Sequence, residues 1–132
     1  MNRDEPGPNP LGVSNEGAVR LCRQWMVHLG ATDTVVASGP TRAVCDLFSS
    51  RYVAWVDNGR EALGATAVLR AAEVASSDGR QAMIFKRGGI GGDAQRQADR
   101  RGVALFSYLP SDGILEGANP LGYQLRAAGL SA

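Results

Sequence analysis

The apolar residues near the start of the chain recur every three or four positions: Val19, Cys22, Met26 and Leu29. Residues with this spacing share one face of a helix. Ser14 or Asn15 can cap the start of such a helix, and Glu16 places a negative charge in its first turn, which the helix dipole favours. Gly30 ends the pattern. We therefore expect an amphipathic helix over about 15–29, with its apolar stripe in the core.

Three short runs rich in β-branched and aromatic residues follow: Thr34–Ala37, Arg42–Phe48 and Arg51–Val56. Gly39-Pro40 separates the first run from the second, and Ser49-Ser50 can form a two-residue turn between the second and the third. The pattern predicts a meander of three antiparallel strands.

Five further segments alternate between helix and strand: a helix over 61–76, a strand at Gln81–Phe85, a helix from Asp93 to near Gly102, a strand at Val103–Tyr108 and a helix over 118–128. The order αβββαβαβα predicts an α/β fold with a mixed central sheet flanked by helices on both faces. Residues 1–13 contain three prolines and two glycines, and we expect a flexible arm there. Residues 14–132 then form one domain.

Composition and hydropathy add four constraints on function. The formal net charge is +1, so any contact with nucleic acid has to come from a local patch. Cys22 and Cys45 lie in apolar stretches, which favours buried free thiols in a reducing compartment, with a disulfide between them as the alternative. One histidine, His28, and no cysteine cluster argue against structural zinc. Without an apolar run of spanning length or a signal peptide, we expect a cytoplasmic protein with no membrane partner.

Four segments carry a resemblance to a known superfamily: GAVRLCRQWMVHLGATDTVV, AVCDLFSSRYVAWVDN, GRQAMIFKRGG and ADRRGVALF. Their order and spacing, with the step Leu29–Asp33 from helix to strand, resemble the restriction-endonuclease-like superfamily, the PD-(D/E)xK nucleases, and its Mrr branch in particular. The resemblance covers about residues 14–130. It implies the fold of that superfamily and a site for metal-dependent hydrolysis of phosphodiesters.

The resemblance also assigns roles to individual residues. Asp46 stands where the first aspartate of the family belongs, and Glu16 matches a glutamate that many Mrr-like members carry on the first helix. Such carboxylates hold Mg²⁺, which polarises the phosphate and generates hydroxide. The Q-x-K position reads Trp55-Val56-Asp57, so a tryptophan replaces one ligand and an aspartate replaces the lysine that stabilises developing charge. The resemblance therefore implies a degenerate site.

The predicted hairpin offers a structural interpretation of the same residues. With a two-residue turn, Asp46 faces Val53, and Arg42 faces Asp57 in a cross-strand ion pair. Trp55 then fills the former cleft with apolar surface. In this interpretation Asp46 is a polar residue at a strand end, and Glu16 serves the helix dipole.

A set of basic residues surrounds the glycine-rich segment Gly88–Gly92: Lys86, Arg87, Arg96, Arg100 and Arg101. Backbone amides at a helix start, beside cations, can hold a phosphate, so this set predicts a contact with the DNA backbone. A solvated helix face is the alternative, and Asp93 at the cap competes for the amides. Lys86 is also the candidate for a migrated catalytic lysine; phosphate contact or plain solvation are its other interpretations.

Three functions follow as hypotheses. The first is a degenerate, non-catalytic Mrr-type domain, without a cofactor, that binds DNA or a partner protein. The second is an active endodeoxyribonuclease that uses Asp46, Glu16 and Lys86 with Mg²⁺. The third is an interaction module from a phage or mobile element that binds a protein partner or forms a homodimer; the near-zero net charge favours it.

Overall fold

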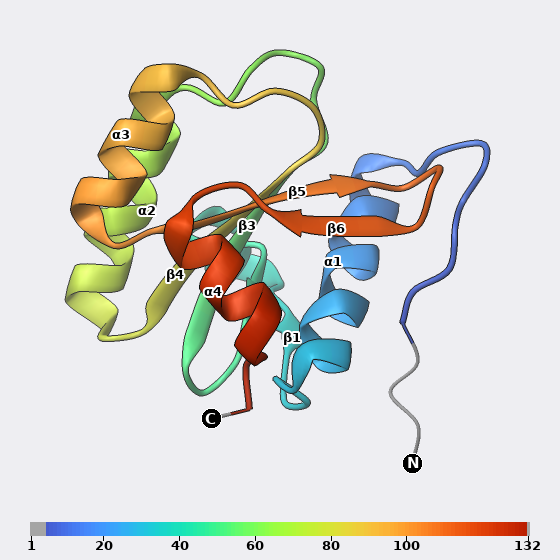
Figure 1. Ribbon diagram of the computed structural model, residues 1–132. Helices are drawn as coiled ribbons and strands as arrows, with labels where there is room; N and C mark the ends of the chain where they lie inside the picture. Colours follow the sequence, from blue (N-terminus) through green and yellow to red (C-terminus); the bar gives the residue numbers. More distant parts are fainter. Residues whose placement is uncertain (1–4, 132) are drawn as a thin grey trace.

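A mixed sheet of six strands forms the centre of the computed structural model, which describes residues 5–131 (Figure 1). The strands lie in chain order: β1 (Val35–Val36), β2 (Leu47–Phe48), β3 (Tyr52–Asp57), β4 (Gln81–Lys86), β5 (Ala104–Leu109) and β6 (Ile114–Gly117). Strands β3, β4 and β5 run parallel to one another, whereas β1, β2 and β6 pair antiparallel with their neighbours. The mixed sheet predicted from the sequence is confirmed.

Helices cover both faces of this sheet. The four α-helices are α1 (Asn15–Leu29), α2 (Ala65–Asp78), α3 (Gly92–Arg101) and α4 (Pro120–Ala128), and a 3₁₀ helix, η1, spans Gly39–Ala43. One face packs against α1 and α4 and the other against α2 and α3, which gives three layers (Figure 1). None of the helices in the described range is long and apolar enough to span a membrane.

The core consists of two apolar clusters, one on each face of the sheet. Successive side chains of a strand point to opposite faces, so Met83 and Phe85 of β4 face α1 and α4, whereas Ile84 faces α2 and α3. Phe85 stacks on Phe106 of β5, with ring centroids 5.1 Å apart. The predicted stripe of α1 is buried in the first of these clusters, as expected.

The bounds of α1 agree with the prediction. The Ser14 hydroxyl accepts a hydrogen bond from the Gly17 amide at 3.0 Å, which satisfies one of the free amides of the first turn. Gly30 ends the helix with a φ of 122°, a conformation that favours glycine.

The strand predicted over Arg42–Phe48 is wrong for most of its length. Gly39 takes a φ of 57°, and Pro40 occupies the first turn of η1, where a proline loses no hydrogen bond. The chain therefore coils through Ala43 and enters the sheet only at Leu47. As a result, Arg42 lies in η1 and is not paired with a residue of β3.

The register of the hairpin also differs from the prediction. Val53 faces Phe48 and not Asp46, because the turn closes with the Ser49 amide donating to the Tyr52 carbonyl at 2.9 Å. The Ser50 amide, at the tip, donates to the Asp33 carboxylate at 2.8 Å. This contact with the segment before β1 favours a turn centred one residue later than predicted, at Ser50-Arg51. Local spacing does not reveal that Asp33 and Ser50 are partners.

Strand β6 was missed, so the predicted order αβββαβαβα lacks one strand. Gly113, with a φ of 66°, allows the chain to reverse after β5. The prediction of Asp93 as a helix cap is wrong as well: Gly91 is the cap residue of α3, and the Asp93 carboxylate pairs with Arg96.

Residues 5–13 of the expected arm form no helix or strand, and residues 1–4 lie outside the described residues. The Asn9 amide donates to the Pro110 carbonyl at 2.7 Å, and Pro6 is buried. This part of the arm therefore lies along the turn between β5 and β6.

Candidate functional site

Arg42 lies between two carboxylates that come from different elements. Its Nη2 is 2.6 Å from Glu16 Oε1, in the first turn of α1, and its Nε is 2.9 Å from Asp46 Oδ1, just before β2. The hydrogen bonds that Arg42 donates to Glu16, and secondly to Asp46, raise the pKa of its guanidinium. The expected Arg42–Asp57 ion pair is wrong, because η1 directs Arg42 toward α1.

Asp46 has a second protein donor. Its Oδ2 accepts a hydrogen bond from the Val56 amide on β3 at 2.7 Å. Both carboxylate oxygens are thus engaged, one by a guanidinium and one by a peptide group. Two cysteine thiols lie near Asp46. Their own burial raises the pKa values of Cys22 and Cys45, and the negative charge of Asp46 raises them further. Both cysteines are buried and free, so the alternative of a disulfide between them is wrong.

Asp57 pairs instead with Lys86, the residue beside it on β4. Lys86 Nζ lies 3.3 Å from Asp57 Oδ1 and donates to the Gly59 carbonyl at 2.6 Å. The Gly59 amide in turn donates to Asp57 Oδ1 at 2.9 Å. The Lys86 side chain is 0% exposed, so its interpretation as a solvated cation is wrong. It fixes the turn after β3.

Trp55 lies between the two ion pairs, on the same strand as Asp57. Its indole Nε1 donates to the Val44 carbonyl at 2.8 Å, and its ring lines a pocket of about 480 Å³ together with Asp46 and Asp57. The indole offers no oxygen to a ligand in this pocket. Trp55 is only half-buried, so it narrows the cleft without filling it.

These residues do not fit a magnesium ion. Mg²⁺ needs oxygen ligands in a near-octahedral arrangement, but Arg42 occupies the space between Glu16 and Asp46, and Lys86 holds Asp57. Within residues 5–131, no three side chains of histidine, cysteine, aspartate or glutamate are grouped so that they could hold a metal. Glu16 and Asp46 lie on either side of the Arg42 guanidinium, and Asp57 lies against the Lys86 ammonium group.

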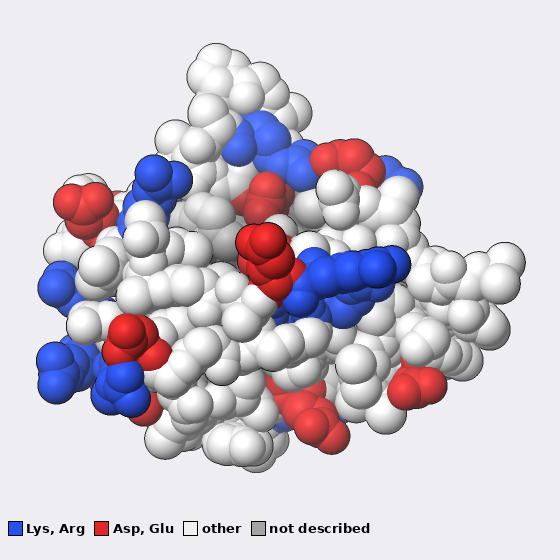
Figure 2. Space-filling model, turned by 90° about the horizontal axis from the view of Figure 1, so that it is seen from above, with Lys and Arg blue, Asp and Glu red and all other residues white. Residues whose placement is uncertain are grey.

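The five basic residues expected to bind DNA do not lie together. Lys86 is buried, and Arg87 follows it at the end of β4. Arg96 pairs with Asp93, whereas Arg100 and Arg101 lie at the far end of α3. Along the helix axis, Arg100 lies about 12 Å from Gly92, where the glycine-rich segment ends. Basic and acidic side chains alternate over the face seen in Figure 2.

Two polar residues near this site were missed from the sequence. Asn58 donates from Nδ2 to the Val13 carbonyl at 3.1 Å and to Asn15 Oδ1 at 3.3 Å. The Tyr108 hydroxyl donates to Asn58 Oδ1 at 2.8 Å, and burial raises its pKa. Asn58 thereby joins the arm, α1 and β5. The only local signal is an Asn-Gly pair directly after a strand.

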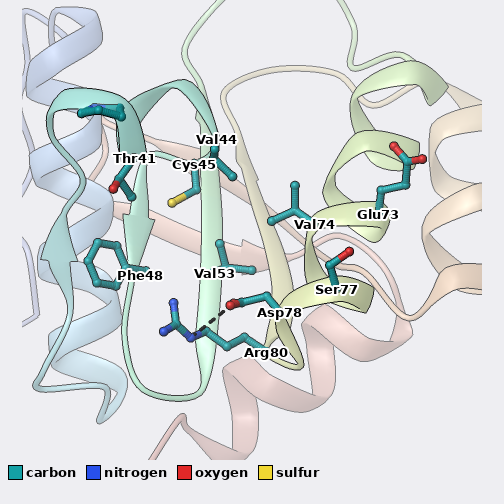
Figure 3. A pocket seen from close by; sticks show the side chains of 11 residues that line it. Thr41, Val44, Cys45, Phe48, Val53, Glu73, Val74, Ser77, Asp78 and Arg80 are labelled. Carbon is teal, nitrogen blue, oxygen red and sulfur yellow. Dashed lines mark ion pairs between the residues drawn. The ribbon is translucent and has the colours of Figure 1, made fainter.

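An apolar groove of about 930 Å³ lies beside the site, between α2 and the η1–β2 segment (Figure 3). Val44, Val53 and Val74 line it from its two sides, and Val44 is 50% exposed. At one end Arg80 pairs with Asp78 at 3.3 Å. Phe48 of β2 also lines the groove and is only partly buried against the core of this face.

Comparison with models of protein families, with curated proteins and with solved structures found no match. The class of this protein therefore rests on its structure: an α/β protein with a six-stranded mixed sheet between two pairs of helices.

Proposed function

We propose that this chain is a non-catalytic nucleic-acid-binding domain with a restriction-endonuclease-like fold, in which an arginine takes the place of a metal ion. The order of its first elements supports the proposal: a helix, three antiparallel strands, then a helix and a strand parallel to β3. This is the arrangement that the resemblance implies.

One observation carries the non-catalytic part of the proposal: the Arg42 guanidinium bridges Glu16 and Asp46. A divalent ion would have to displace this cation, and the two carboxylates would then lose charge-assisted hydrogen bonds. Trp55 occupies the position where the resemblance implies a further metal ligand, and its side chain has no oxygen atom to offer. The chain thus keeps the carboxylates of a nuclease site while its own side chain neutralises them.

The experiment compares the wild type with Arg42→Gln. Incubated with plasmid and Mg²⁺ or Mn²⁺, the wild type should leave the DNA intact, and calorimetric titration with Mn²⁺ should show no binding. Arg42→Gln should gain Mn²⁺ binding, because both carboxylates lose their cation. Arg100→Gln removes the same charge far from the site and should gain none. Nicking by the wild type that Asp46→Ala abolishes would refute the proposal.

The nucleic-acid part is tested separately, by a mobility shift at low ionic strength, where phosphate contacts are strongest. Both single-stranded and duplex DNA are used. A salt-sensitive shift supports binding through phosphates. Absence of any shift with either DNA would refute nucleic-acid binding, and the site in which Arg42 bridges the two carboxylates would then have no assigned function.

An active nuclease is the alternative, and one observation favours it: Lys86 pairs with Asp57, which lines the cleft beside Asp46 and Trp55. In this reading Lys86 replaces the missing motif lysine, and Arg42 leaves Glu16 and Asp46 when substrate binds. Cleavage that requires Asp46 and Lys86 in the pure protein would establish it over the first proposal.

A protein-interaction module is the other alternative, and the groove of Figure 3 favours it. Its exposed Val44 is the residue to change. If the groove holds a second copy of the chain, light scattering should report a dimer that Val44→Glu converts to a monomer.

A further inference from the structure

A second pocket, of about 540 Å³, lies on the other side of the turn after β3. Four segments that are far apart in the sequence form its walls: residues 10–12 of the arm, 59–60, 87–88 and 109–111. Such a volume suits a small organic ligand. None of the functions considered above uses it.

Two arginines, Arg60 and Arg87, line this pocket, and no aspartate or glutamate does. Among residues 5–131, neither guanidinium has an ion pair or a hydrogen-bond acceptor. Glu61 and Asp112 are neighbours of lining residues in the sequence but do not line the pocket themselves. Two cations on one concave surface with no anion among its walls produce a positive potential that favours an anionic ligand.

The backbone that carries these arginines is held firmly. The Arg87 amide donates to the Asp57 carbonyl at 3.0 Å, and Lys86 binds the Gly59 carbonyl directly before Arg60. On the opposite wall, Asn9 binds Pro110, as described above. These contacts fix the segments on which Arg60 and Arg87 stand before a ligand arrives, which lowers the entropy lost on binding.

Apart from Ser111 and three glycines, the other residues that line the pocket are leucines and prolines. Leu11 of the arm is fully exposed, at 102%, and Leu109 at the end of β5 is 40% exposed; Pro110 lies beside them. Exposed leucines at the edge of a cationic pocket suit a ligand with an anionic group at one end and a flat apolar group at the other.

We propose that this pocket binds the phosphate ester of a nucleotide. Arg60 and Arg87 donate charge-assisted hydrogen bonds to the phosphate oxygens, for which the guanidinium fork is suited. Leu11 and Leu109 contact the base. The phosphate belongs either to a free mononucleotide or to the terminal nucleotide of a strand; in the second case the inference rests on the proposed nucleic-acid function.

The test is calorimetric titration at low ionic strength with deoxyadenosine 5′-monophosphate, deoxyadenosine, inorganic phosphate, and a short single strand with and without a 5′-phosphate. The mononucleotide should bind and deoxyadenosine should not, and inorganic phosphate should compete. Arg60→Gln with Arg87→Gln should weaken mononucleotide binding at least about ten-fold, the effect of losing a charge-assisted contact. Arg100→Gln with Arg101→Gln removes the same charge elsewhere and should change little.

The outcomes separate the two possible ligands and the two proposals. Tighter binding of the 5′-phosphorylated strand than of the mononucleotide assigns the pocket to a strand end. Binding of the mononucleotide alone assigns it to a free nucleotide, and the nucleic-acid function then fails while the pocket stands. Mononucleotide binding that Arg60→Gln with Arg87→Gln does not weaken refutes the pocket and spares the proposed function. The proposed pocket is also refuted if the mononucleotide does not bind, or if the Arg60/Arg87 and Arg100/Arg101 double variants lose the same amount of mononucleotide affinity.

Discussion

Two clusters of charged residues lie on either side of one turn. Gly59 lines a pocket of about 410 Å³ beside Arg42 and also lines the pocket of Arg60 and Arg87. In the first cluster, two carboxylates surround the Arg42 guanidinium, so the charges are matched within the protein. In the second, Arg60 and Arg87 face a pocket without a carboxylate. The difference indicates where a ligand should bind. A cluster whose charges are paired within the protein stabilises the fold, whereas a cluster of unpaired cations attracts an anion from solution.

The comparison also has energetic content. Removing a partner from a matched cluster leaves a partly buried charge without its counterion, which destabilises the folded state. Removing an arginine from an unmatched pocket relieves like-charge repulsion and leaves no group unsatisfied. The two regions should therefore respond in opposite ways to similar substitutions.

The largest effect is expected at Lys86, between the two clusters. Lys86→Met keeps most of the apolar stem but removes the hydrogen bond of the buried ammonium group to the Gly59 carbonyl and its ion pair with Asp57, and it should lower the free energy of unfolding by about 2–3 kcal/mol. Urea denaturation measures this. The exposed Arg100→Met serves as the control and should change stability by less than about 0.5 kcal/mol. Equal values for the two variants would mean that other contacts hold the turn.

Arg42→Met should have the next largest effect. The Arg42 side chain is 27% exposed and Glu16 is 62% exposed, so solvent screens part of the loss, and we expect about 1–2 kcal/mol of destabilisation. A double-mutant cycle with Asp46→Asn isolates the interaction. A coupling energy near zero would show that the ion pair between Arg42 and Asp46 does not stabilise the fold. The claim that matched charges stabilise this cluster would then be wrong.

The sequence predicted the outline of this structure and missed the parts that depend on distant contacts. The bounds of α1 and the buried β4 follow from local periodicity and capping, which need no partner. Strand β6 has four residues, too short for a clear alternation. The hairpin register depends on Asp33, which lies well before the turn it stabilises.

The site shows the same division. Glu16, Asp46 and Asp57 were all identified as candidates, and the structure brings Glu16 and Asp46 onto one arginine. The partners were wrong, because a 3₁₀ helix in place of a strand turns Arg42 toward α1 and leaves Asp57 to Lys86. The pocket of Arg60 and Arg87 needs four segments to meet, and no local pattern reports that.

A smaller effect should appear at Asp33, a carboxylate matched by a peptide group. The Ser50 amide bonds its carboxylate at 2.8 Å and lowers its pKa from the ordinary 3.8. Because the folded-state pKa lies below that of the unfolded chain, the stabilisation is complete above about pH 5 and is lost as the pH falls through the folded value. The difference in Tm between wild type and Asp33→Ala should therefore be present at pH 7 and shrink below pH 4. Ser111→Ala, at an exposed residue without a titratable group, is the control and should show no such trend.

The smallest effect on stability is expected at the unmatched pocket, and it is the sharpest test of the comparison. Neither Arg60 nor Arg87 has a side-chain partner in the described part of the chain, so replacing both by glutamine should change the free energy of unfolding by less than about 0.5 kcal/mol. Because the double variant removes the repulsion between the two cations, we expect the change to be a slight increase in the free energy of unfolding. Urea denaturation beside Arg42→Met measures both regions on one scale. A loss as large as that of Arg42→Met would mean that the pocket arginines stabilise the fold, and the distinction between matched and unmatched clusters would fail.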